Sequence, residues 1–255
     1  MAAVEVERRD RVGIIRLNRP EARNAVNGDL ASGVEAALDD FEADDAIQAV
    51  IVTGNGPTFC AGADLKLIAA GRGAEMATAR GNFAGLVRRN FPKPIIAAVN
   101  GPAFAGGFEI VLACDLVVAA EEAQFGIPEV KRGLFAAAGA LIRLPKRVPL
   151  ALATELAITG DPIDAQRALQ LGLVTRVVPL AELVDAALEL AARIAANGPL
   201  AVRKTLQMVR EAGDLTEEEA WPRNFELAME VFASKDSIEG ATAFAEKRPP
   251  RWTGT

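Results

Sequence analysis

The chain of 255 residues has a formal net charge of −6 at neutral pH, with 51% hydrophobic and 24% charged residues. This composition is typical of a folded protein with a substantial core, and the acidic balance argues against nucleic acid as the main partner. Histidine and tyrosine are absent, which excludes Ser-His-Asp and Cys-His nucleophile systems and the HExxH type of zinc site. Any proton transfer must therefore use carboxylates, lysine or water.

The two cysteines, Cys60 and Cys114, both lie in apolar sequence. We expect them to be small buried residues of a protein in a reducing compartment. The first ten residues are charged and lack the apolar core of a signal peptide, and no apolar run approaches the length of a membrane span. These features predict a cytoplasmic protein that binds neither membrane nor nucleic acid.

The N-terminal part of the chain alternates short apolar strands with helices. Val12–Leu17 has the composition of a strand, and Ala49–Thr53 that of a second, buried strand. Between them, Asp29–Phe41 places its apolar side chains on one face of a helix, with Asn27 as the N-cap. The loop Gly54–Lys66 then leads into a helix that starts near residue 63 or 64.

The middle of the chain contains the most unusual stretch. A helix is expected over Glu75–Asn90, ended by a proline-rich segment, and Ile95–Val99 has the pattern of a buried strand. Gly106-Gly107 then opens an apolar helical run, Phe108–Cys114, whose one charged residue is Glu109. A carboxylate among apolar neighbours is costly unless it is hydrogen-bonded, neutralised or used in chemistry.

Short strands continue at Leu116–Ala119, Gln124–Gly126 and Val174–Val178, and Pro128 introduces a turn that carries Glu129. From residue 180 onward the pattern is almost wholly helical, over Leu180–Asn197, Pro199–Ala212, Glu217–Ser234 and Ser237–Lys247. We therefore expect an α/β core over residues 1–195 and a helical C-terminal subdomain over residues 196–255.

Two strand-to-helix corners and two carboxylates carry the candidate chemistry. Small residues at 59–64 and at Gly106-Gly107 let a ligand approach the backbone, where N–H groups such as that of Ala63 are free to donate. Glu109 lies in an apolar run, and Glu129 follows a proline in a turn. Each feature alone is also typical of a plain tight turn, a packing glycine or a solvated glutamate.

Two N–H donors that converge on one oxygen, beside two carboxylates, provide what addition of water to an α,β-unsaturated thioester requires. The donors stabilise the enolate oxygen, one carboxylate deprotonates the attacking water, and the other, protonated, delivers a proton to the α-carbon. Two neighbouring carboxyl groups titrate as a coupled pair, so the sequence leaves the division of roles between them open.

Three ordered motifs connect these features to a known family: FCAGADLK at 59–66, AVNGPAFAGGFEIVLACD at 98–115 and FGIPEVKRGL at 125–134. They resemble the crotonase, or enoyl-CoA hydratase, superfamily, and the likeness extends from residue 18 to residue 250. The resemblance implies an α/β fold, a spiral of ββα units with a helical C-terminal trimerisation region, assembled as a homotrimer or homohexamer. The FAGGFE segment and the C-terminal tail look particularly like the crotonobetainyl-CoA hydratase (carnitinyl-CoA dehydratase) members and their actinobacterial relatives.

By position in these motifs, the resemblance implies that the Ala63 and Gly106 N–H groups form an oxyanion hole for the thioester carbonyl. It implies Glu109 as the water-activating residue and Glu129 as the residue that protonates the α-carbon. Coenzyme A enters as part of the acyl-CoA substrate, with no separate cofactor and no metal. The residues implied to bind it are Ala22, Arg23, Ala61, Ala63, Asp64, Leu65, Lys66, Gly106, Phe244 and Lys247, the last two in relatives sometimes from a neighbouring subunit.

The chain departs from the family pattern at two places. Many hydratases carry a Gly/Pro-rich turn where this chain has Leu134–Gly139, which leaves the shape of the acyl pocket and the position of the water open. The common glycine triplet is Ala105-Gly106-Gly107 here, and an alanine at the first position is tolerated if its backbone lies in an ordinary region.

The presence of both glutamates favours hydration or the reverse dehydration. Two alternatives remain: an enoyl-CoA isomerase of the same superfamily that uses one carboxylate, and a non-catalytic scaffold that binds coenzyme A. A nucleotide phosphate loop is disfavoured, because Gly107 is followed by Phe108 rather than by lysine. The spacing of GPAFAGG also does not fit the dinucleotide-binding fingerprint.

Overall fold

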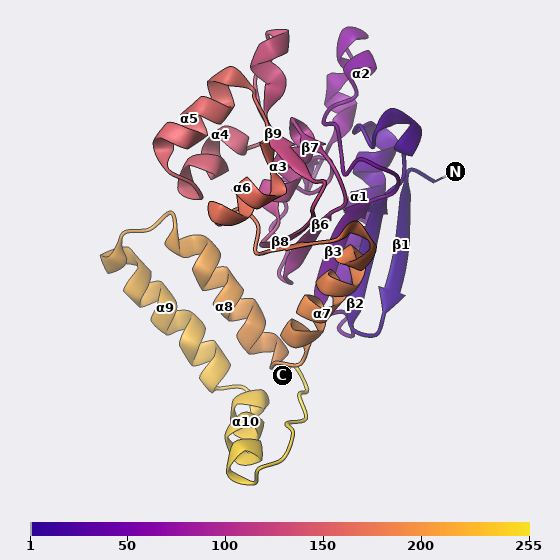
Figure 1. Ribbon diagram of the computed structural model, residues 1–255. Helices are drawn as coiled ribbons and strands as arrows, with labels where there is room; N and C mark the ends of the chain where they lie inside the picture. Colours follow the sequence, from indigo (N-terminus) through magenta and orange to yellow (C-terminus); the bar gives the residue numbers. More distant parts are fainter. Residues whose placement is uncertain (1) are drawn as a thin grey trace.

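The computed structural model describes residues 2–255, and a six-stranded sheet forms its centre (Figure 1). Its first two strands pair antiparallel, and all other neighbouring pairs are parallel. In spatial order the strands are β1 (Val4–Arg9), β2 (Val12–Leu17), β3 (Ala49–Gly54), β6 (Ile95–Val99), β8 (Leu116–Ala120) and β11 (Arg176–Val178). The strands predicted from their apolar composition are thereby confirmed.

Two smaller sheets complete the β-structure. The first has β9 (Gln124–Gly126) between β7 (Ala103–Phe104) and β10 (Ile163–Asp164), parallel to β7 and antiparallel to β10. The second is a hairpin of β4 (Ala77–Thr78) and β5 (Asn82–Phe83). Because β7 pairs with β9, the residues just before helix α3 lie beside those just before Glu129.

The described part of the chain contains ten α-helices. They are α1 (Gly28–Ala43), α2 (Leu65–Ala69), α3 (Gly106–Ala113), α4 (Ala140–Arg143), α5 (Leu150–Thr159), α6 (Ala165–Gln170), α7 (Leu183–Ala195), α8 (Pro199–Ala212), α9 (Glu217–Phe232) and α10 (Lys235–Ala245). Five short 3₁₀ helices are η1 (Pro20–Ala22), η2 (Gly73–Met76), η3 (Pro128–Arg132), η4 (Leu144–Lys146) and η5 (Leu180–Glu182). Within residues 2–255, no helix combines the length and apolar character that crossing a membrane requires.

The large sheet is buried on both faces, as expected of parallel strands with helical connections. Successive residues of a strand point to opposite faces, so Ile14 of β2 packs on one side and Ile15 on the other. Helix α7 covers the first face through Leu183, Ala187 and Ala191. The second face packs against α1 and α3 in the larger core cluster.

Local signals in the sequence account for several element boundaries. Asn27 caps α1 as predicted, because its side-chain oxygen accepts the N–H of Leu30 at 3.0 Å. Asp64 caps α2, so this helix begins where the sequence predicted. Cys60 and Cys114 are buried and unpaired, also as predicted, and burial raises the pKa of each thiol to about 12.

The helix predicted over Glu75–Asn90 is wrong. This segment forms the end of η2, the β4–β5 hairpin and a series of turns. The carboxylate of Glu35, on α1, accepts the N–H of Gly81 at 2.8 Å and so draws the segment onto α1. Ala84 and Gly85 have positive φ values of 56° and 69°, which a right-handed helix does not allow. A tertiary contact has therefore overridden the local helical pattern.

Helices α8, α9 and α10 extend away from the α/β part of the molecule (Figure 1). The chain then returns, and the indole N–H of Trp252 donates to the carbonyl oxygen of Ala196 at 2.8 Å. The carboxylate of Asp236, at the start of α10, accepts the N–H groups of Thr253 and Gly254 at 2.7 and 2.9 Å. The helices lie within the predicted C-terminal region, while its separation at residue 196 as a subdomain stays a prediction.

Candidate active site

The two strand-to-helix corners singled out in the sequence touch each other. Cys60 forms a parallel bridge with Ala103, which aligns the two segments. A Cβ atom at Gly62 would lie 3.0 Å from the backbone nitrogen of Gly106, so only a glycine fits this close approach. The N–H of Ala63, the next residue, therefore belongs to the same small region as the N–H of Gly106.

Both of these N–H groups lack an acceptor within residues 2–255. Gly106 is the first residue of α3, and the first N–H groups of a helix have no partner inside it. At the other corner, Val26 bonds the carbonyl of Gly62 and the N–H of Asp64, and leaves the N–H of Ala63 unused. The corners thus present two unpaired N–H groups in one small region, and their convergence on a single ligand oxygen stays a prediction.

Ala105 precedes α3 and has φ 52° and ψ −128°. The condition under which an alanine is readily tolerated here, an ordinary backbone region, is not met, because a side chain at this φ is strained. The conformation is imposed by bonds on both sides: the N–H of Ala105 donates to Gly126 in β9, and its carbonyl accepts the N–H of Phe108 in α3, both at 2.9 Å. The strain therefore lies at the residue that sets the direction of the Gly106 N–H.

The aromatic ring of Phe83, on β5, lies against Gly106 at the start of α3. A Cβ atom at Gly106 would be only 2.5 Å from two ring atoms of Phe83. The ring thus lies over the α-carbon of Gly106 and leaves no room for a side chain there. Sequence analysis missed Phe83, because it placed this residue on a helix.

Glu109 is buried on α3, with only 3% of its surface exposed. Its Oε1 atom accepts the N–H of Ala140, at the start of α4, at 3.0 Å. Burial raises the pKa of Glu109, whereas the N–H groups of residues 138–140 and the positive charge of Arg143 act in the opposite direction. The carboxyl group is therefore desolvated, and N–H donors from a single turn partly offset the cost of burying its charge.

The N–H that bonds Glu109 directly follows Leu134–Gly139, the segment that the sequence suggested as a departure from the family pattern. Leu134–Gly139 leads into α4, and Gly139, with φ 112°, turns the chain immediately before the helix. This geometry brings the N–H of Ala140 onto the Glu109 carboxylate. Ala140 and Arg143 were not among the predicted site residues, since no motif in the sequence connects them to Glu109.

Glu129 lies in the 3₁₀ helix η3, half-buried near Glu109. Burial, with the charge of Glu109 as a further contribution, raises the pKa of Glu129 to about 7. Its Oε2 atom is buried and has no hydrogen-bond partner among the described residues. The charge of Glu109 thus acts on the ionisation of Glu129, while the role of the two residues as a catalytic pair stays a prediction.

The residues implied to bind coenzyme A from the N-terminal half lie together. The N–H of Ala61 donates to the carbonyl oxygen of Arg23 at 3.0 Å, and Val26 bridges Ala63. This pairing places the segment of Ala22 beside residues 61–66. Arg23 and Lys66 are exposed, and neither side chain forms an ion pair with any carboxylate within residues 2–255.

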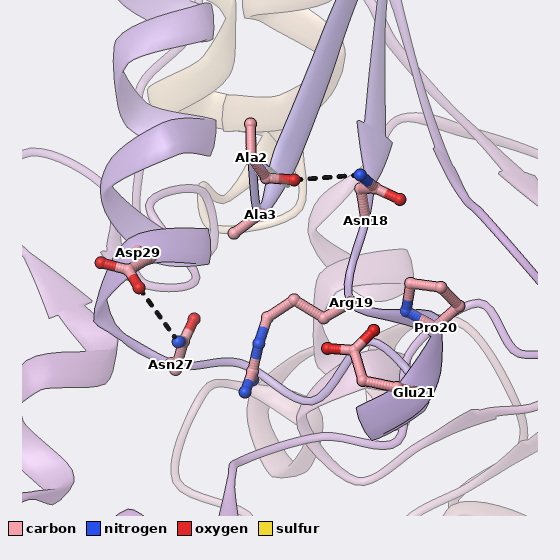
Figure 2. Close-up of a pocket in the computed structure, with 8 residues that line it drawn as sticks. All are labelled: Ala2, Ala3, Asn18, Arg19, Pro20, Glu21, Asn27 and Asp29. Atoms are coloured by element: carbon pink, nitrogen blue, oxygen red, sulfur yellow. Dashed lines mark hydrogen bonds between the residues drawn. The ribbon is translucent and has the colours of Figure 1, made fainter.

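Asp64 has a more specific environment than the sequence suggested. Both terminal nitrogens of Arg19 donate to its Oδ2 atom at 3.2 Å, and its Oδ1 atom accepts the N–H of Lys66 at 3.1 Å. A cavity of about 400 Å³ lies beside Arg19 (Figure 2). The carboxylate of Asp64 thus holds the start of α2 to this part of the chain, while Leu65 and Lys66 in the same helix are exposed.

Phe244 and Lys247 are not brought to this site within one chain. Phe244 lies on α10 and is 86% exposed, and Lys247 follows the end of that helix. Helix α10 lies at the opposite end of the molecule from α2 (Figure 1). Residues 2–255 also do not group three metal-ligating side chains into a candidate metal site.

Comparison with known proteins agrees with this geometry. The model of the enoyl-CoA hydratase/isomerase family matches residues 7–255. The enoyl-CoA hydratase EchA19 of Mycobacterium tuberculosis is 42% identical over 99% of both chains, and the carnitinyl-CoA dehydratase of Proteus mirabilis is 40% identical over 93% of both. The crystal structure of an enoyl-CoA hydratase from Mycobacterium tuberculosis H37Rv superposes with a TM-score of 0.95 at 48% identity, covering 100% of both chains. The chain therefore belongs to the enoyl-CoA hydratase/isomerase family of the crotonase superfamily, as its three motifs predicted.

Proposed function

We propose that this protein adds water to a 2-enoyl-CoA thioester to give the 3-hydroxyacyl-CoA, or catalyses the reverse dehydration. One observation carries the proposal: two interacting carboxyl groups, Glu109 and Glu129, occur with the adjoining unpaired N–H groups of Ala63 and Gly106. The relatives are named hydratases and dehydratases, which supports a hydro-lyase.

In the hydration direction, the N–H groups of Ala63 and Gly106 bind the thioester oxygen. Glu109 takes a proton from water as the water oxygen bonds to the β-carbon, and the π electrons move onto the thioester oxygen as an enolate. Glu129 then gives its proton to the α-carbon, and the enolate collapses to the saturated thioester. Water is consumed, and one proton passes to Glu109 as another leaves Glu129.

The raised pKa of Glu129 supports this division of roles. With a pKa of about 7, a large fraction of Glu129 still carries its proton at neutral pH, and its unpaired Oε2 atom is available for the α-carbon. Glu109 receives donors from residues 138–140 that favour its ionised form. The proposed reaction needs one proton shared by the pair, and the same number of protons serves the reverse reaction with the roles exchanged.

Coenzyme A is proposed to bind along Ala22, Arg23 and residues 61–66, where two unpaired cations meet its phosphates. Phe244 and Lys247 then reach the coenzyme from a neighbouring subunit of a homotrimer or homohexamer. Exposed apolar side chains on the C-terminal helices support such an assembly, since large exposed apolar surfaces are typical of interfaces. They are Trp221, Phe225, Met229 and Phe232 on α9, and Ile238 and Phe244 on α10.

The test is incubation with crotonyl-CoA and with a longer or branched enoyl-CoA while the ultraviolet absorbance of the conjugated thioester is followed. We expect the absorbance to fall, and Glu129→Gln to slow the reaction by at least about a hundredfold. Glu121→Gln, a change of an exposed glutamate, serves as the matched control.

Other outcomes distinguish the alternatives. Unchanged turnover in Glu129→Gln would refute the role given to this residue. Tight binding of coenzyme A without turnover of any enoyl thioester would indicate a scaffold. Migration of the double bond without uptake of water would indicate an isomerase.

A further inference from the structure

Arg143, at the end of α4, is a half-buried cation that the proposed reaction does not use directly. Its Nη1 atom donates to the carbonyl oxygen of Ala138 at 3.2 Å, and its Nη2 atom donates to the carbonyl oxygen of Val87. It forms no ion pair at contact distance with any carboxylate within residues 2–255. Burying a guanidinium without a carboxylate in contact is costly, so the position of Arg143 needs a physical explanation.

The turn before α4 is shaped around this guanidinium. A Cβ atom at Gly139 would lie only 2.2 Å from Nη1 of Arg143, and the φ of Gly139 is 112°. Glycine therefore allows the side chain of Arg143 to fold back over the turn from which its own helix starts. The next residue, Ala140, donates its N–H to Glu109 at 3.0 Å.

We infer that Arg143 is a positioning residue for Glu109: by bonding the carbonyl oxygens of Ala138 and Val87, it fixes the turn whose N–H groups hold the carboxylate. Val87 follows the hairpin that places Phe83 against Gly106. One guanidinium thus connects the turn that holds the proposed base to the segment that covers the oxyanion corner.

The charge of Arg143 acts on the same carboxylate. The positive charge of Arg143 lowers the pKa of Glu109. The carboxyl group of Glu129, on η3, is another charged group that interacts with Glu109. Arg143 is itself faced by Arg147, Arg88 and the Cys114 thiol. The cation that lowers the pKa of Glu129 is a different residue, Arg132. The two members of the pair therefore have separate cationic neighbours, which allows them to be perturbed separately.

The test rests on the proposed function and compares pH profiles of kcat/KM for the full-length enzyme with crotonyl-CoA. Arg143→Lys keeps the charge but cannot bond both carbonyl oxygens, so we expect kcat to fall about tenfold while KM stays within about twofold. The acid limb of the pH profile, which reports the ionisation of Glu109, should not move. Arg143→Gln removes the charge as well, so the pKa of Glu109 rises and the acid limb should move to higher pH. Arg132→Gln should instead move the basic limb upward.

Arg147→Gln is the matched control, because Arg147 is a neighbouring half-buried arginine that donates to the Cys114 carbonyl at 3.0 Å. It should lower the melting temperature without changing either limb. If Arg143→Lys keeps the wild-type kcat, or if Arg143→Gln has the same kcat and profile as Arg147→Gln, the inference is wrong. Where Arg143→Gln fails to fold, Arg143→Lys alone decides the outcome. Full activity in Glu109→Gln would instead overturn the base role in the proposed function, whatever the Arg143 variants do.

Discussion

The raised pKa of Glu129 has a consequence for stability that is separate from catalysis. Burial, with the charge of Glu109, raises the pKa of this carboxyl group from 4.5 to about 7. Between these values the unfolded chain loses the proton while the folded protein keeps it, so stability is lost as the pH rises towards 7. At about 1.4 kcal/mol for each pH unit, the full loss approaches about 3 kcal/mol.

Replacement of Glu129 by glutamine removes this loss, because the amide does not ionise. We expect Glu129→Gln to be more stable than the wild type, by an amount that grows by about 2 to 3 kcal/mol between pH 5 and pH 8. The measurement is urea unfolding of both proteins at several pH values, with Glu121→Gln as the exposed control.

The expected pattern is a variant that is more stable yet far less active at neutral pH. A difference in unfolding free energy that stays constant from pH 5 to pH 8 would show that Glu129 ionises normally. The reasoning from its burial and its carboxyl neighbour would then be refuted.

Three further predictions follow from the same site. Activity should decline above pH about 7, where Glu129 loses its proton, and a rate that keeps rising to pH 9 would contradict this assignment. Ala105→Gly should raise the unfolding free energy by about 1 kcal/mol, because it relieves the strain at φ 52°; thermal unfolding measures this, and a loss of stability would argue against strain. Gly106→Ala should lower kcat by about 10² or more, because a Cβ atom there would lie 2.5 Å from the ring of Phe83. Adding Phe83→Ala should recover part of that loss, whereas purely additive effects of the two changes would exclude the steric cause.

Much of the fold could be predicted because its signals are local. Val12–Leu17 and Ile95–Val99 are apolar runs bounded by turn residues, and both form strands of the large sheet over the predicted residues. Asn27 caps α1 through a contact only three residues away. Signals of this kind depend on neighbouring residues and do not need the tertiary structure.

The elements that were missed depend on contacts between distant residues. Residues 75–90 have a helical pattern, but the carboxylate of Glu35, on α1, accepts the N–H of Gly81 and holds this segment in a different conformation. The partner of Glu109 is a backbone N–H at Ala140, and backbone donors leave no trace in side-chain motifs. The conformation of Ala105 is set by Gly126, 21 positions later, which pulls the chain into a region that alanine alone avoids.

The placement of Gly106 and Glu109 on the single eight-residue helix α3 affects how this scaffold can change. Residues three apart lie on the same side of a helix, so a shift of α3 moves the Gly106 N–H and the Glu109 carboxylate as one rigid unit. Glu129 lies outside α3, on the 3₁₀ helix η3. Under the proposed roles, substitutions around η3 can therefore change proton delivery to the α-carbon without moving the groups proposed to bind the thioester oxygen and activate water.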